Sequence, residues 1–353
     1  MLSDTDIHAS IHRIHDLWFD DGNIVLQAAN CQFRVHRGIL AACSPVFKDM
    51  LSFPQPADVE LVEGCPLVRL TDHPKEVTVF LKAIFKPDYF MPFPAHTDYA
   101  IISGCLRLGH KYDVEHLRLR ALVHLSSAFR TTLSEWDTAE YFNPGVGKET
   151  PPSACALSQI ISWNSQGTDT QISCIQLARE VNALWILPAA FYSLSTSLIH
   201  PMSLMPVFNG TVCRGVNVNL AAQDLEAFLD GHSQQTLVSA VRFLGSLSEP
   251  GDSSPACDGP AGCSIGRLSA IHSLRDLIAL QPSAPLELWS NWEGFDEEVC
   301  YPCRDSLEDA HEQMRKSFWD GLPEMYGLPS WRQLEQMRDA AIGSHWFVPA
   351  AES

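Results

Sequence analysis

The chain has 353 residues, of which 46% are hydrophobic and 19% charged, proportions typical of a globular protein rather than a disordered or fibrous one. This length is sufficient for two or three domains, each with its own core. The formal net charge of −18 would repel a phosphate backbone, and Lys and Arg nowhere form a run longer than a pair. We therefore expect no direct contact with nucleic acid.

Three further features bear on the compartment. Asp4 and Asp6 stand where a signal peptide needs basic residues, and no apolar segment follows them. The most apolar stretch, residues 183–208, is interrupted by prolines, which argues against a membrane-spanning helix. Most of the 11 cysteines lie singly within apolar patterns, as in reduced proteins. We expect an intracellular protein, cytoplasmic or nuclear, with no membrane contact.

The first region, residues 14–129, has the pattern of an α+β fold. Short strands are expected at Trp18–Phe19 and at residues 24–28, with residues 21–23 as the turn between them. The segment 32–35 would pair with the preceding strand as a hairpin, and residues 66–70 form another strand. Three helices are then expected from apolar residues at helical spacing, the first capped by Asp72: residues 77–85, 99–109 and 114–125.

The most informative segment, residues 33–50, reads FRVHRGILAACSPVFKDM. Ser44 is a good N-cap, and Pro45 would occupy the first helical position, where its missing N–H costs nothing. We therefore expect two short helices, the second beginning at Pro45. The apolar residues at helical spacings are Ile39, Leu40, Val46, Phe47 and Met50.

This pattern, F-x-V-H-R-x-I-L-x-x-x-S-P-V-F-x-x-M, resembles the BTB/POZ domain, a protein–protein interaction module. The resemblance implies a small sheet flanked by helices and a function in partner binding rather than catalysis. Of the residues that carry it, we interpret Leu40, Phe47 and Met50 as core. The framework residues are His36, Arg37, Leu40, Ser44, Phe47 and Met50.

The resemblance also suggests how such a domain could self-associate. Many dimeric BTB domains form a charged pocket from an Asp in the first strand and the Arg of the His-Arg pair. Here Asn23 stands at about the Asp position, Asp20 and Asp21 lie close to it, and Arg37 is retained. A homodimer pocket made by these four residues is one hypothesis.

A second hypothesis concerns cullin binding. Cullin-binding members often carry an apolar-x-Glu element just after the second short helix. The nearest match is Phe53-Pro54-Gln55, in which a neutral amide replaces the acid. Phe53 is therefore a candidate cullin contact, and an adaptor of a cullin ubiquitin ligase is an alternative to a self-associating scaffold.

The remaining chain divides into two mainly helical regions, residues 153–248 and 256–353, behind linkers at 143–152 and 249–255. Here the chain is similar to BTB proteins abundant in mushroom-forming fungi, through short motifs such as those at residues 187–192 and 319–323. Near the end, Ser330 and Gln333 have the spacing of a helix capping box.

The last region contains one arrangement with the chemistry of a metal site. Cys257 and Cys263 are followed, beyond a helix expected around residues 265–280, by Cys300 and Cys303. Four thiolates suit tetrahedral Zn²⁺ and leave no open position, so such an ion would be structural. His311 could replace one thiolate. For these cysteines, the alternatives to zinc are a redox dithiol at Cys300 and Cys303 and unliganded thiols. For the whole protein, a zinc-containing transcriptional regulator is an alternative function.

The sequence offers little support for a catalytic site. The glycine-rich phosphate loops G-x-x-x-x-G-K and G-x-G-x-x-G are absent. His311-Glu312 begins like a zinc-protease helix, but Arg315 stands where the second histidine is required. The sequence thus predicts a non-catalytic scaffold or adaptor.

Overall fold

The computed structural model describes residues 10–53, 60–141, 160–198, 204–248, 257, 259, 262–269, 284–286 and 299–343, the side chains of 140, 141 and 239–248 excepted. Both expected linkers, residues 143–152 and 249–255, lie outside these ranges. Within the described part of the chain, no helix is long and apolar enough to cross a membrane.

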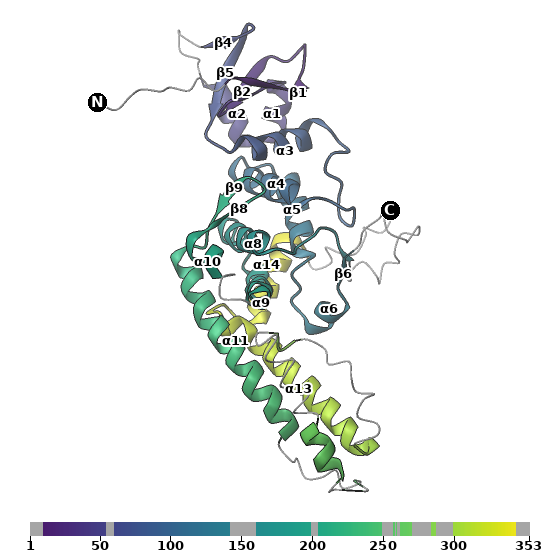
Figure 1. The fold of residues 1–353 in the computed structure, drawn as a ribbon. Coiled ribbons are helices and arrows are strands. Elements are labelled where there is room, and N and C mark those ends of the chain that lie inside the picture. Colours follow the sequence, from purple (N-terminus) through teal and green to yellow (C-terminus); the bar gives the residue numbers. More distant parts are fainter. Residues whose placement is uncertain are drawn as a thin grey trace, which may run out of the picture.

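A five-stranded mixed sheet forms the amino-terminal end of the molecule (Figure 1), in the order β1-β3-β2-β5-β4. The expected hairpin is confirmed, because β2 and β3 are antiparallel with Ile24 opposite Val35. Strands β2 and β5 are parallel. The strand bounds are His12–Trp18 for β1, Ile24–Ala28 for β2, Cys31–Val35 for β3, Leu61–Val62 for β4 and Cys65–Leu70 for β5.

The expected turn between the first two strands does not join a hairpin. Strand β1 pairs with β3 in parallel instead of with β2. The reason is that β2 is the central strand and both its edges are already occupied, by β3 and β5. The backbone at residues 19–23 bonds instead to β3, with the Phe19 N–H donating to Arg34 O and the Asn23 N–H to Val35 O.

Five helices accompany the sheet: α1 Arg37–Cys43, α2 Pro45–Ser52, α3 Pro74–Phe85, α4 Tyr99–Lys111 and α5 Glu115–Ser126. Ser44 caps α2 as predicted, accepting a 3.0 Å hydrogen bond from the Phe47 N–H. The cap of α3 is His73 rather than Asp72. Asp72 instead accepts hydrogen bonds from Lys111 Nζ and Tyr112 OH, so its carboxylate joins α3 to the end of α4.

The rest of the described chain is mainly helical, as the sequence predicts. Two small two-stranded sheets accompany its helices, β6 Glu140–Tyr141 with β7 Ile160–Ile161, and β8 Thr211–Cys213 with β9 Val216–Val218. The helices are α6 Leu133–Thr138, α8 Thr168–Glu180, η1 Leu184–Ile186, α9 Leu187–Ser197, α10 Met205–Asn209, α11 Ala222–Ser248, α13 Tyr301–Met325 and α14 Trp331–Ile342. The predicted capping box begins α14, where the Ser330 N–H donates to Gln333 Oε1 at 3.2 Å.

The long helices α11 and α13 pack along each other and extend away from the sheet (Figure 1); we call this pair the helical arm. Gly231 permits their close approach, because a Cβ there would overlap the Tyr326 ring. Tyr326 donates a 2.7 Å hydrogen bond to Gln235 and stacks on Phe191 of α9. The arm is thereby attached at its inner end to the core of the molecule.

One hydrophobic core continues from the sheet into the helical region. Trp163 and Trp185 are both buried there and link the two parts. The Trp163 indole donates to His124 O at 2.7 Å and stacks on Tyr99, while the Trp185 indole donates to Ser126 Oγ at 3.0 Å. Helix α8 packs on α4, and α14 packs on α5.

Candidate functional site

The framework residues of the motif lie at the junction of α1 and α2. Leu40 and Phe47 are fully buried, and Met50 is half-buried against the same core. The His36 ring is half-buried and lies 5.3 Å from the ring of Phe19, centroid to centroid. The apolar members of the motif thus position the two short helices.

Ser44 connects these helices to the rest of the amino-terminal region. It is fully buried, and its hydroxyl donates to Tyr112 O while accepting from the Phe47 N–H. Phe47 stacks on the Tyr112 ring with centroids 4.5 Å apart. The α2 helix is therefore fixed to the end of α4 by one hydroxyl and one aromatic pair.

The four residues of the hypothetical dimer pocket are all exposed, and only some of them touch each other. Asn23 Oδ1 accepts a 2.8 Å hydrogen bond from the Arg37 backbone N–H, at the start of α1. The Arg37 guanidinium donates to Leu51 O. Asp21 lies 3.4 Å from His36 Nε2, whereas Asp20 projects from the same exposed loop.

Phe53 immediately follows α2, and its residue surface is 68% exposed. Two more apolar side chains of the same short helices, Ile39 and Val46, are exposed to 42% and 39%. The rest of the candidate cullin element, Pro54 and Gln55, lies outside the described residues. The α1–α2 unit therefore has a buried side that packs on the core and an outer side with accessible apolar groups.

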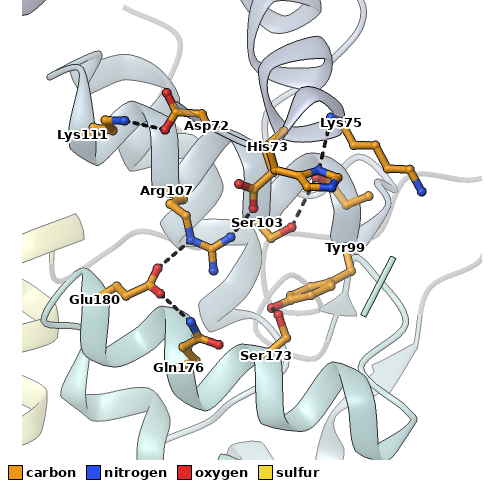
Figure 2. A network of polar contacts seen from close by, with 12 residues as sticks. Asp72, His73, Lys75, Tyr99, Ser103, Arg107, Lys111, Ser173, Gln176 and Glu180 are labelled. Atoms are coloured by element: carbon orange, nitrogen blue, oxygen red, sulfur yellow. Dashed lines mark hydrogen bonds and ion pairs between the residues drawn. The ribbon is translucent and has the colours of Figure 1, made fainter. Parts of the chain in front are cut away.

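A network of polar contacts that sequence reasoning missed joins α3 and α4 to α8 (Figure 2). Arg107 Nε donates to Glu180 Oε2 at 2.6 Å, and its Nη1 pairs with Glu76. Close to it, Tyr99 OH donates to Ser173 Oγ at 2.8 Å. Arg107 and Glu180 are 73 positions apart in the chain, a separation over which a single sequence carries no pairing signal.

Glu76 is the buried member of this network. Burial raises its pKa above the usual value, although the Arg107 guanidinium acts in the opposite direction. Removal of Arg107 would leave this buried carboxylate without its charged partner. The contact thus sets the relative position of α3, α4 and α8.

The four C-terminal cysteines come together at the outer end of the helical arm, as the sequence predicts. Their Sγ atoms all lie within 4.8 Å of one another. Cys300 is the N-cap of α13 and Cys303 lies in its first turn, while Cys263 belongs to the helical residues 262–269. We call Cys257, residues 262–269, Cys300 and Cys303 the arm tip.

Two of the distances between these sulfurs match those expected around a tetrahedral ion. Cys257 Sγ lies 3.7 Å from Cys263 Sγ and 3.8 Å from Cys300 Sγ. Two thiolates bound to one zinc at about 2.3 Å with tetrahedral angles would be about 3.8 Å apart. In addition, the Cys300 N–H points at Cys263 Sγ, 3.3 Å away, which is the kind of donor that supports a metal-bound thiolate.

Burial and the neighbouring thiols raise the pKa of Cys303 well above its ordinary value. A cation at the centre of the cluster would reverse this shift, since a coordinating thiol is deprotonated by the metal. The group that could hold a metal consists of the four cysteines, and His311, farther along α13, does not belong to it. Burial lowers the pKa of His311 to about 4.

Arg315 follows His311 by one helical turn and is fully buried. Its guanidinium binds Asp137 and donates to Glu312 Oε2 at 2.9 Å and to Leu286 O at 3.1 Å. The position where a zinc protease would require its second histidine therefore carries an arginine that bridges α13 to α6. Glu312 accordingly pairs with Arg315, on the same helix.

The comparisons with known proteins agree with the amino-terminal motif. The family model of the BTB/POZ domain matches residues 19–126. No curated protein and no solved structure matches the chain. Residues 19–126 thus form a BTB/POZ domain, a non-catalytic protein–protein interaction module, and a mainly helical region follows it.

Proposed function

We propose that the whole protein is a non-catalytic scaffold that binds protein partners through its BTB/POZ domain inside the cell. The observation that carries this proposal is the family match over residues 19–126. It is supported by the α1–α2 unit, which keeps Leu40 and Phe47 inside while Ile39, Val46 and Phe53 stay accessible. Such exposed apolar groups beside a rigid framework are suited to partner binding.

The finer function within this class is either self-association or recruitment of a cullin. Phe53 favours the adaptor role, because a large aromatic side chain that is 68% exposed next to a helix end is an effective anchor for a partner. Self-association would instead place the exposed polar groups of Asn23 and Arg37, which contact each other, in an interface with a second copy of the chain. The two roles differ in which partner co-purifies.

The test is affinity purification of the intact protein followed by mass spectrometry, for the wild type and for Phe53→Ala. Phe208→Ala is the matched control, since Phe208 on α10 is also half-exposed, at 51%, but lies outside the BTB/POZ domain. Recovery of a cullin with the wild type and Phe208→Ala, but not with Phe53→Ala, would establish the adaptor role. If the tagged chain instead recovers untagged copies of itself and no cullin, the self-associating scaffold is established.

We further propose that Cys257, Cys263, Cys300 and Cys303 hold a structural zinc ion. The clustering of the four Sγ atoms within 4.8 Å and the distances of 3.7 and 3.8 Å from Cys257 Sγ to Cys263 Sγ and Cys300 Sγ support it. Elemental analysis of the purified protein should find roughly one zinc per chain. Cys303→Ser should lose the metal, while Cys43→Ser, which changes a half-buried cysteine of α1, should keep it.

A zinc-dependent transcriptional regulator is a weaker alternative, because the net charge of −18 opposes binding to nucleic acid. An electrophoretic shift of duplex DNA that requires zinc would favour it over the scaffold.

A further inference from the structure

The arm tip contains two cysteines that differ from the other two in their accessibility. Cys257 and Cys300 are partly exposed, whereas Cys263 and Cys303 are buried. Cys257 Sγ and Cys300 Sγ lie 3.8 Å apart and come from chain segments separated by 43 positions. The accessible half of the cluster thus consists of two sulfurs already close to each other, one from each segment.

We propose that this site is a redox-sensitive zinc site, in which hydrogen peroxide converts Cys257 and Cys300 into a disulfide and releases the metal. The inference rests on the zinc site proposed above, because zinc is what keeps these sulfurs as thiolates. Thiolate character together with exposure is what makes a cysteine susceptible to peroxide. Closing the pair requires the two sulfurs to approach from 3.8 Å to a bond of about 2.0 Å.

The reaction balances with the peroxide as the only oxidant. One thiolate attacks the peroxide, the O–O bond breaks, and a sulfenic acid and water form after uptake of one proton. The second thiolate then attacks the sulfenic sulfur, the S–O bond breaks, and the hydroxide leaves as water with a second proton. Each sulfur loses one electron, and the two peroxide oxygens gain the pair.

The disulfide removes two of the four ligands at once. Cys263 and Cys303 alone cannot supply the four-coordinate environment of a structural zinc site, so the ion is lost. The new bond still connects the chain ahead of residues 262–269 to the start of α13. Ile265 and Leu268 of the arm tip, and Tyr301 next to Cys300, are 65–69% exposed, so the exchange takes place beside accessible apolar side chains.

Cysteines outside the cluster provide an internal reference for the reaction. Cys31 and Cys43 are also partly accessible, but burial raises the pKa of each thiol. They are therefore mostly protonated at neutral pH and react slowly with peroxide. Cys105 and Cys174 are completely buried and serve as thiols that only unfolding would expose.

The experiment uses the full chain, reduced and loaded with zinc, in the presence of a chromogenic zinc chelator. Bound zinc is first measured without oxidant, then hydrogen peroxide is added in small excess, and the thiols are mapped by differential alkylation and mass spectrometry. We expect complete loss of zinc, a Cys257–Cys300 disulfide, and unoxidised Cys31, Cys43, Cys105 and Cys174. Dithiothreitol with added ZnCl₂ should restore the bound metal, and Cys43→Ser should behave as the wild type.

The possible failures are distinguishable. If the reduced protein binds no zinc, the proposed zinc site is wrong, and so is the redox reaction that depends on it. If zinc is bound but remains in place while Cys31 and Cys43 are oxidised, the zinc site stands and the redox inference is overturned. A disulfide confined to Cys257–Cys263 or to Cys300–Cys303 would overturn the assigned pair.

Discussion

The BTB/POZ domain and the arm tip are organised by different interactions. In the domain, Leu40 and Phe47 are fully buried, and a buried hydroxyl of Ser44 satisfies backbone groups on two elements. At the arm tip, Ile265 and Leu268 are instead exposed, and the buried groups are mainly thiols. A segment that buries so little apolar surface needs another source of stability, such as a metal.

The largest effect should follow removal of the metal. For the wild type treated with a strong zinc chelator, and for Cys303→Ser, we expect residues 262–269 and the first turns of α13 to lose protection from hydrogen exchange. The free energy of zinc binding to such sites, of order 10 kcal/mol, would no longer stabilise the tip. Protection of β2, β3 and α4 should not change. Equal loss of protection in the domain would contradict the division between the two regions.

In the BTB/POZ domain the largest effect should come from the buried apolar framework. Phe47→Ala removes a ring that is fully buried and stacked on Tyr112, and should lower the free energy of unfolding by about 3–5 kcal/mol. Val46→Ala, at the neighbouring exposed position of α2, should cost less than about 1 kcal/mol. Denaturant unfolding measures both. Similar losses for the two variants would show that α2 is not anchored through Phe47.

The pH dependence of stability should report on buried histidines. Burial lowers the pKa of His124 to about 4 from an unfolded value near 6.5, and its ring contacts Ser162 Oγ and Met91 O. The unfolded state therefore binds the proton more tightly. The stabilisation is complete above about pH 6.5 and is lost as the pH falls through about 4, by up to about 3 kcal/mol.

Unfolding of wild type, His124→Gln and the exposed-site control His110→Gln, measured between pH 7 and 4, checks this. The slope of stability against pH should become shallower only for His124→Gln. An unchanged slope in that variant would place the acid sensitivity elsewhere, with buried His311 in α13 as the next group to replace.

A smaller effect is expected at the contact between the domain and the helical region. Arg107→Ala leaves buried Glu76 without its guanidinium partner and should cost about 2 kcal/mol, reduced from the value for a fully buried pair because Arg107 is partly exposed. Arg118→Ala breaks an exposed pair with Glu115 within one helix and should cost less than about 1 kcal/mol. Equal costs would mean that Arg107 does not position α8 against α3 and α4.

Local features of the fold were predictable because the residues involved are close in the chain. The cap at Ser44, the proline at the start of α2 and the capping box at Ser330 depend on residues within a few positions, and the β2–β3 hairpin pairs residues at most 11 positions apart, Ile24 and Val35. The burial of Leu40 and Phe47 followed from their spacing on one helical face. The association of the cysteine pairs was a hypothesis from ligand spacing, and the 4.8 Å cluster agrees with it.

Only the tertiary structure decided contacts between distant segments. The parallel pairing of β1 with β3 depends on which edges of the sheet are free after β5 has paired with β2. Asp72 has the sequence position of a helix cap, but its carboxylate accepts hydrogen bonds from Lys111 and Tyr112 instead, because α4 packs against α3. The bridge from Arg107 to Glu180 likewise exists only because the shared core brings α8 onto α4. Residue type and local spacing thus determined the helices, the strands and the interaction motif. Long-range packing decided which of these elements contact each other, because many alternative pairings satisfy the same local pattern.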